Sequence, residues 1–288
     1  MNLFIVVGKV PPRIRKRLAR PYEFAIRLRD KLLRKRDGLH YLWFHKPYSL
    51  VNAREYWSYP PSKRTGKRHT KDYLHKDDSY IKNLIESQIS LRDLREDAEV
   101  ARSRVKHLIK NNNVQKMMDF GCGLGVDGVY FSINLGIQVT FADISLSNVN
   151  LTDRYAQIWN IPTKSVYVDD STSFDFGDKF DLIYANGVLH HIPEPKPVVD
   201  NLKRFLNSNG LFIVMLYTKE HYASKMAENV YHYAVRSEAP APITITNPYS
   251  SYYDTAKAVE LFEGCSLIDQ WKTNRDRFGW YCFRHEDY

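Results

Sequence analysis

The chain has 288 residues, of which 43% are hydrophobic and 14% aromatic, enough for a packed core, so a wholly disordered protein is excluded. Its longest apolar run, Leu211 to Leu216, is too short to cross a bilayer, and the apolar stretch Leu3 to Val7 has no basic region before it, so we expect no membrane span and no secretory signal. The formal net charge of +9 is concentrated in Lys9 to Arg36, where twelve basic residues face two acidic ones and the rest of the chain is close to neutral.

The cysteines are three in number and widely spaced, at Cys122, Cys265 and Cys282. They form neither a metal-ligand pattern nor a disulfide framework, which is typical of a protein in a reducing compartment. We therefore expect no metal site and a cytoplasmic location.

The first 75 residues are basic and aromatic, without a clear period, and are predicted to form an N-terminal extension. Within it, Arg13 to Arg36 can form helix around Pro21. The next segment, Asp78 to Lys110, is helical in pattern, because its apolar residues recur at intervals of three and four. We expect it to pack on the sheet edge just before the first strand.

From Lys116 onward the patterns of strand and helix alternate, which predicts a parallel sheet with right-handed crossovers. The polar turn Thr273 to Asp276 separates two final strand-like segments, a closing antiparallel hairpin. The predicted fold is therefore α/β, a Rossmann-like and mostly parallel sheet with a C-terminal antiparallel hairpin and an N-terminal helical extension. Residues 76–288 form the main domain, with a cap inserted at about 218–254. The predicted strands are 116–120, 138–143, 164–168, 180–185, 210–217, 266–272 and 279–285, and the predicted helices are 125–135, 146–159, 197–206 and 255–262.

Acidic and glycine residues gather where four successive strands are predicted to end. Asp119 to Gly125 reads Asp-Phe-Gly-Cys-Gly-Leu-Gly, and its three glycines allow the backbone to turn sharply and approach a ligand. Asp143 ends the second strand, Asp169 and Asp170 follow the third, and Phe180 to Glu194 begins as the fourth. Because parallel strands end at one edge of the sheet, this layout predicts a nucleotide-like pocket there.

The region from about Met117 to Tyr217, roughly a third of the chain, carries these four parts in order and closely resembles class I S-adenosylmethionine-dependent methyltransferases. Within that group it looks most like the small-molecule, quinone-biosynthesis-like branch. The resemblance implies S-adenosylmethionine as the cofactor, and its sulfonium, ammonium and ribose hydroxyls are groups that suit carboxylates.

The resemblance also implies roles for individual residues. The glycines would approach the methionine part of the cofactor, Asp143 would accept from both ribose hydroxyls, and either Asp169 or Asp170 would receive the adenine amino group. Ile144 would pack on the adenine. Asn186 and Gly187 would lie near the transferred methyl. The implied cofactor-binding residues are Asp119, Gly121, Cys122, Gly123, Gly125, Asp143, Ile144, Asp169, Asp170, Asn186 and Gly187.

Other interpretations of these residues stay open. A strand-end aspartate can serve only as a helix cap or turn former. The glycines Gly123, Gly125 and Gly128 also fit the fingerprint of dinucleotide oxidoreductases, although the fourth-strand sequence and the closing hairpin argue against that class.

Methyl transfer needs a base only when the acceptor carries a proton it must lose, and the candidates are His190, His191 and His221. The predicted acceptor pocket uses the segment after the fifth strand, with Tyr217, Tyr222 and Arg236 as candidate substrate contacts. These residues can equally form the core of a cap.

The expected acceptor is an oxygen or nitrogen of a small or lipid-linked metabolite. Methylation of RNA or protein, and a non-catalytic cofactor-binding protein, are the alternatives. For residues 9–36 an anionic membrane surface is one candidate partner, which would make the protein peripheral at the membrane; nucleic acid is a second, and a solvated or protein-contacting arm is a third.

Overall fold

The computed structural model describes residues 53–54, 57–58, 69–94, 96–168, 174–223, 233–235, 244–246 and 251–286. The chain divides into two compact units, one of Tyr48–Tyr231 with Pro248–Tyr288 and one of Met1–Pro47 with His232–Asn247. The predicted helix at Arg13 to Arg36 lies outside the described residues. The division at residue 75 and the cap at 218–254 stay predictions.

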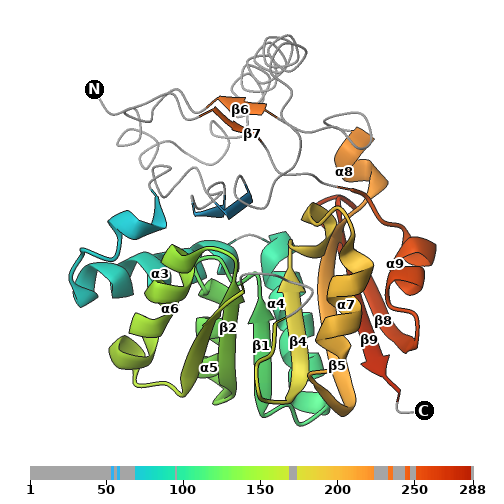
Figure 1. The fold of residues 1–288 in the computed structure, drawn as a ribbon, viewed down its shortest axis with the longest axis horizontal. Helices are drawn as coiled ribbons and strands as arrows, with labels where there is room; N and C mark the ends of the chain where they lie inside the picture. The colour runs from blue at the N-terminus through green and yellow to red at the C-terminus, as the bar shows by residue number, and fades with distance from the viewer. Residues whose placement is uncertain are drawn as a thin grey trace, which may run out of the picture. The chain divides into compact units, whose positions relative to one another are not determined.

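The larger unit is built on one seven-stranded sheet, ordered β3-β2-β1-β4-β5-β9-β8 (Figure 1). Strands β1 to β5 are parallel, and β9 runs antiparallel between β5 and β8, so the predicted mostly parallel sheet with a closing hairpin is confirmed. The strands are β1 (Lys116–Phe120), β2 (Gln138–Asp143), β3 (Thr163–Tyr167), β4 (Phe180–Asn186), β5 (Leu206–Tyr217), β8 (Cys265–Thr273) and β9 (Phe278–His285).

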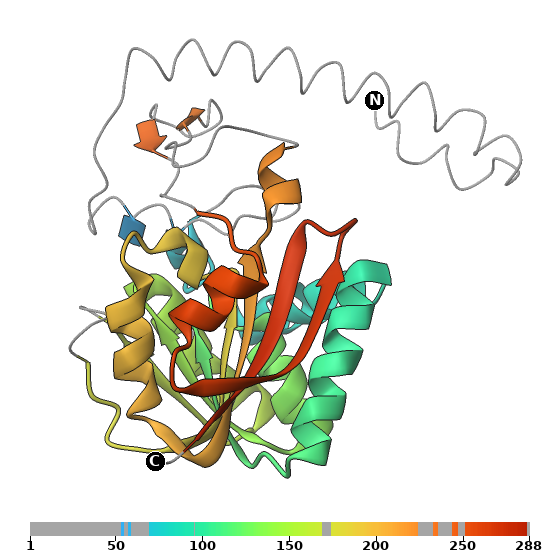
Figure 2. The same cartoon turned by 90° about the vertical axis from the view of Figure 1, so that its right-hand side faces the viewer.

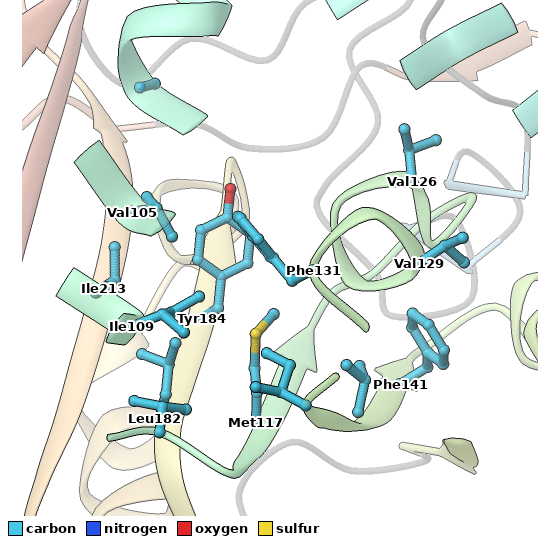
Figure 3. Packing of buried hydrophobic residues seen from close by; sticks show 14 of the residues in the cluster. Val105, Ile109, Met117, Val126, Val129, Phe131, Phe141, Leu182, Tyr184 and Ile213 are labelled. Carbon is cyan, nitrogen blue, oxygen red and sulfur yellow. The ribbon is translucent and has the colours of Figure 1, made fainter. Parts of the chain in front are cut away.

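Helices cover both faces of this sheet. One core cluster joins α3, α4, α5 and α6 to one face, and a second joins α7 and α9 to the other. Figure 2 shows α4 and α9 on opposite sides of the β8–β9 hairpin, and Figure 3 shows how Phe131, Phe141 and Tyr184 pack around Met117 of β1. The helices are η4 (Thr70–Asp72), α3 (Asp78–Asp93), α4 (Glu96–Asn111), α5 (Val126–Leu135), α6 (Leu146–Trp159), η5 (Leu189–His191), α7 (Pro195–Lys203), α8 (Lys219–Ala223) and α9 (Thr255–Leu261).

Side-chain caps fix where several of these helices begin. Asp77 accepts a 2.7 Å hydrogen bond from the Tyr80 N–H at the start of α3, and Asp254 accepts one of 2.9 Å from Lys257 N–H at the start of α9. Each cap satisfies an N–H that has no partner within its helix.

The predicted helical segment Asp78 to Lys110 proves to be two helices, α3 and α4. α3 ends at Asp93, and Leu94 at its C-cap is 82% exposed. Buried apolar residues on both helices join the same core, so a break lets each present its own apolar face to it. α4 does contact the edge strand β8, where Arg104 Nε donates to Asp269 Oδ2 at 2.9 Å.

Strand β5 begins earlier than its predicted start at 210. Leu206 pairs with Phe180, and the next pair is Leu211 with Leu182, so the polar residues between form a bulge. Asn209 takes a left-handed φ of 59° there. A polar bulge of this kind has the sequence pattern of a turn, which is why the strand start was predicted too late.

The smaller unit contributes one described element, the antiparallel pair of β6 (Tyr233–Val235) and β7 (Thr244–Thr246). Both strands fall within the predicted cap. Over the described parts of the chain, no helix combines the length and apolarity that crossing a bilayer requires.

Candidate functional site

The glycine loop lies between β1 and α5, at the carboxyl end of the central strands. Gly121, Gly123 and Gly125 all have left-handed φ angles, of 71°, 55° and 65°, so the backbone conformation itself favours glycine. A Cβ on Gly121 would lie 2.3 Å from Val188 Cγ2, whereas one on Gly123 would meet no atom of the described residues within 4 Å. The first glycine therefore serves packing, and the second faces open space in which a ligand can approach the backbone.

Asp143 closes the loop from the end of β2. Its Oδ2 accepts a 2.8 Å hydrogen bond from the Gly123 N–H, and its Oδ1 accepts from the Ser145 N–H at 2.8 Å and from Asn148 Nδ2 at 3.1 Å. Burial raises the pKa of the Asp143 carboxyl, and the two N–H donors partly offset that rise. Because a carboxylate oxygen can accept two hydrogen bonds, Oδ2 keeps capacity for a ligand hydroxyl.

The pKa values of two other loop residues are raised. Burial, followed by repulsion from Asp127, raises the pKa of Asp119 well above its ordinary value. Burial likewise raises the pKa of the Cys122 thiol well above its usual range. A thiol with a raised pKa is a poor nucleophile, so Cys122 acts as a small residue in a crowded turn.

A charged cluster that sequence reasoning missed lies beside the loop, centred on Asp127 in the first turn of α5. The Asp127 carboxylate ion-pairs with Arg92 of α3 and accepts from Tyr184 OH at 3.2 Å and Asn186 Nδ2 at 3.0 Å. Burial opposes ionisation, but the attraction of Arg92 and Arg102 outweighs it, so the pKa of Asp127 is lowered. Of the predicted residues, only Asn186 belongs to this cluster.

The Arg92 side chain is 37% exposed, whereas that of Arg102 is 5% exposed. Arg102 Nη2 lies 3.7 Å from Asp127 Oδ1, its guanidinium lies 4.1 Å from the centroid of the Tyr130 ring, and its Nη1 pairs with Asp93. The Arg102 guanidinium is therefore buried among Asp93, Asp127 and Tyr130. Of the two arginines, Arg92 is the one that a ligand can reach.

The predicted histidines meet at the ends of β4 and β5. The Tyr217 ring is stacked between His190, at 3.7 Å, and His221, at 3.8 Å between ring centroids. His190 is fully buried. Burial, with repulsion from His191 and His221, holds the pKa of His190 well below its ordinary value, so it is neutral.

Residue His191 is half-buried and lies on the outer side of this stack. Its ring centroid is 4.2 Å from that of His190 and 4.8 Å from that of Trp57. The three predicted histidines therefore share one aromatic group at the end of β4 and β5, and Trp57 is a further member of this group.

The remaining predicted residues divide into two groups. Ile144 is half-buried after Asp143, and Gly187, with a left-handed φ of 81°, follows β4. Outside the described residues lie Asp169, Asp170, Arg236 and the side chain of Tyr222. Val168, just before the two aspartates, donates its N–H to the Asp143 carbonyl at 3.0 Å.

A protein-family model described as a methyltransferase domain matches residues 92–251, more than half of the chain. This match covers the glycine loop, Asp143 and the histidine group, so the candidate site lies within it. It also argues against the oxidoreductase interpretation of the glycines.

Curated relatives match a shorter part of the chain. A ubiquinone biosynthesis O-methyltransferase of Glaesserella parasuis serovar 5 is 28% identical over 105 residues, which are 35% of this chain and 44% of that protein. A phosphoethanolamine N-methyltransferase of Triticum aestivum is 26% identical over 106 residues, 36% of this chain and 21% of that protein. The chain thus spans less than half the length of these relatives.

Solved structures agree on the fold. An S-adenosylmethionine-dependent methyltransferase of Clostridium acetobutylicum has a TM-score of 0.52 at 12% identity, covering 65% of this chain and 91% of that one. The 1,6-didemethyltoxoflavin-N1-methyltransferase of Burkholderia thailandensis, solved with bound 1,6-didemethyltoxoflavin and S-adenosylhomocysteine, has a TM-score of 0.50 at 18% identity and covers 72% of this chain and 88% of that one.

Proposed function

Since the chain belongs to the methyltransferase domain family and is an S-adenosylmethionine-dependent methyltransferase, we propose that it transfers a methyl group to an oxygen or nitrogen of a small or lipid-linked metabolite. The observation that carries this proposal is the convergence of the open Gly123 backbone, the Asp143 carboxylate and Asn186 at one edge of the sheet. The relatives named above, which act at oxygen or nitrogen, support the type of acceptor.

The residues present fit the cofactor's adenosine half. The open space at Gly123 admits a ligand against the backbone, and the adjacent Asp143 Oδ2 has room for a ribose hydroxyl. Ile144 would pack on the adenine, and Asp169 or Asp170 would receive its amino group. The bound cofactor supplies a methyl group that its sulfonium has already activated.

For the methionine half we propose Arg92 as the partner of the cofactor carboxylate. Arg92 is partly exposed, ion-pairs with Asp127 and lies beside the glycine loop. A guanidinium can hold two carboxylates at once through its fork of donors, so it can keep Asp127 and still accept the ligand.

The chemistry asks the protein mainly to hold the acceptor in line with the methyl group and to exclude water. Positioning of this kind can supply up to about 7–11 kcal/mol of the barrier. If the acceptor must lose a proton, we favour His191 as the base over His190 and His221, because His190 is fully buried and stacked behind Tyr217. Tyr217, Tyr222 and Arg236 remain our proposed acceptor contacts.

The basic segment 9–36 lies outside the described residues, and its role is argued from charge alone. Twelve basic residues against two acidic ones suit an anionic membrane surface, which would make the protein cytoplasmic and peripheral at the membrane. Full-length protein and a variant lacking residues 1–36 would be compared for co-sedimentation with anionic vesicles and for a salt-titrated RNA shift. Equal behaviour of the two proteins in both assays would reject a membrane role and an RNA role alike.

The reaction itself is tested by incubating the protein with metabolite extract and isotope-labelled S-adenosylmethionine, followed by mass spectrometry. We expect label in a small or lipid-linked molecule, and none with an Asp143→Ala variant. Label in RNA or protein would replace the proposed acceptor. Cofactor binding without transfer to any fraction would reject the enzymatic proposal.

A further inference from the structure

The Trp57 backbone is hydrogen-bonded to the Asn148 side chain, which also orients the Asp143 carboxylate at the proposed ribose site. Asn148 Nδ2 donates to the Trp57 carbonyl oxygen at 3.2 Å and to Asp143 Oδ1 at 3.1 Å. One buried amide group therefore holds two chain segments that are far apart in the sequence. Any displacement of Asn148 changes both at once.

A second connection runs through Ser58. Its hydroxyl lies 2.7 Å from Ser145 Oγ, and the Ser145 N–H donates to Asp143 Oδ1 at 2.8 Å. The Ser58 carbonyl in turn accepts from the Thr70 N–H at 2.7 Å and from Thr70 Oγ1 at 2.9 Å. Ser58, Ser145 and Thr70 are all buried, so these hydrogen bonds are sheltered from water.

The side chain of Trp57 points to a different strand. Its ring centroid lies 4.8 Å from that of His191, which follows β4, at an interplanar angle of 56°. In the sheet, β1 lies between β2 and β4, and two strand spacings amount to about 10 Å. Trp57 therefore spans from the end of β2 to the end of β4, across the end of β1 where the glycine loop begins.

We propose that Trp57 is a positioning residue that forms a wall over the glycine loop, shared by the cofactor and the acceptor. This inference rests on the proposed function. Through Asn148 and Ser58, occupancy of the ribose site at Asp143 fixes Trp57, and Trp57 fixes His191 at the acceptor end. The indole also excludes water from the loop, which strengthens the electrostatic contacts made there.

The test measures S-adenosylhomocysteine affinity by calorimetry for the full chain and five variants. We expect Trp57→Ala to bind about tenfold more weakly, equivalent to about 1.4 kcal/mol. Trp57→Phe keeps an aromatic ring on His191 and should stay within about threefold of the unmodified chain. The matched control Trp271→Phe removes an indole from β8, where it stacks on Trp280, and should change nothing.

Ser58→Ala tests the coupling between Trp57 and Asp143 without changing the indole. The Ser58 hydroxyl reaches Asp143 only through its hydrogen bond with Ser145. We expect the affinity of Ser58→Ala to fall about threefold to tenfold, while Ser103→Ala, which removes an exposed hydroxyl on α4, leaves affinity unchanged. Iodide quenching of tryptophan fluorescence supplies an independent signature. S-adenosylhomocysteine should protect an emission component that Trp57→Phe lacks and Trp271→Phe keeps.

The outcomes separate this inference from the function on which it depends. If the unmodified chain does not bind S-adenosylhomocysteine, the proposed function fails. If it binds, but Trp57→Ala and Ser58→Ala bind equally well and no quenching difference develops, the inference about Trp57 fails and the function stands. If Trp57→Ala does not fold, the fluorescence of Trp57→Phe and the ligand affinity of Ser58→Ala still test the inference about Trp57.

Discussion

The Asp127 carboxylate accepts a 3.0 Å hydrogen bond from Asn186 Nδ2, which joins the first turn of α5 to the end of β4. The same carboxylate ion-pairs with Arg92 of α3. Three elements that approach the glycine loop from different sides are thereby fixed to one buried charge. The proposed methionine end of the cofactor site depends on this arrangement.

Replacing Arg92 by alanine should weaken binding of ligands that carry the methionine carboxylate. A charge-assisted hydrogen bond is worth about 1.5–3 kcal/mol, so we expect a loss of about tenfold to a hundredfold in S-adenosylhomocysteine affinity. Methylthioadenosine, which has no amino-acid part, should bind as before. Calorimetry with both ligands makes the comparison.

Arg104→Ala is the matched control, because Arg104 forms its ion pair with Asp269 on the outer side of α4. It should leave both affinities unchanged. An equal loss of affinity for both ligands in Arg92→Ala would mean that Arg92 supports the fold of the site and does not recognise the ligand carboxylate.

Asp143→Ala should weaken the binding of both S-adenosylhomocysteine and methylthioadenosine, because both ligands carry the ribose. The variant removes the acceptor for a ribose hydroxyl and also leaves the Gly123 and Ser145 N–H groups without their partner. We expect about a tenfold to hundredfold loss of affinity, from one hydrogen bond to a charged group worth about 1.5–3 kcal/mol. Asp143→Asn, which keeps one acceptor oxygen, should lose less. Unchanged calorimetric binding would remove Asp143 from the cofactor site.

Gly121 and Gly123 should respond differently to alanine. Gly121→Ala places a Cβ 2.3 Å from Val188 Cγ2, so thermal unfolding should show a clear loss of stability. Gly123→Ala places its Cβ more than 4 Å from every atom in the described part of the chain, so we expect its stability cost to be that of the left-handed backbone, about 1–2 kcal/mol. The added methyl group occupies the ligand's path, so affinity should fall much more than stability. A Gly123→Ala variant with full affinity would contradict the proposed approach of the cofactor.

Stability should depend on pH through His190. Its folded pKa is held well below the ordinary value by burial, whereas the unfolded side chain titrates near 6.5. Below about pH 6.5 the unfolded state therefore binds a proton that the folded state does not, and stability falls as pH falls, by at most about 1.4 kcal/mol per pH unit.

His190→Phe preserves a ring against Tyr217 and removes that proton. Denaturant unfolding between pH 8 and pH 5 should show a shallower loss of stability for this variant than for the unmodified chain. His107→Gln, a change on α4, controls for the loss of one histidine. Parallel pH curves for the unmodified chain and His190→Phe would show that His190 is not buried in its neutral form.

Sequence periodicity predicted most of the strands and helices correctly, because their apolar residues recur with the periods of buried strands and helices. β1 and β2 lie where they were predicted, and the polar turn before β9 has three left-handed residues, Asn274, Arg275 and Asp276. The errors fall where local chemistry interrupts a period, at the end of α3 and at the bulge in β5.

The acidic and glycine residues of the candidate site could be singled out because each lies at the end of a strand or just beyond it. Asp127 carried a weaker signal, an acid in the first turn of a predicted helix, which ordinarily indicates a cap. Arg92 carried none, because it reaches the site from α3, far from the glycine loop in sequence. Only tertiary packing brings it to the site.

The most direct test of the account is a crystal structure of the protein with S-adenosylhomocysteine. We expect the ligand against residues 119–125, with a ribose hydroxyl on Asp143, its carboxylate toward Arg92 and its sulfur facing Asn186. Ligand density at any other part of the molecule, or a ribose that makes no contact with Asp143, would contradict it.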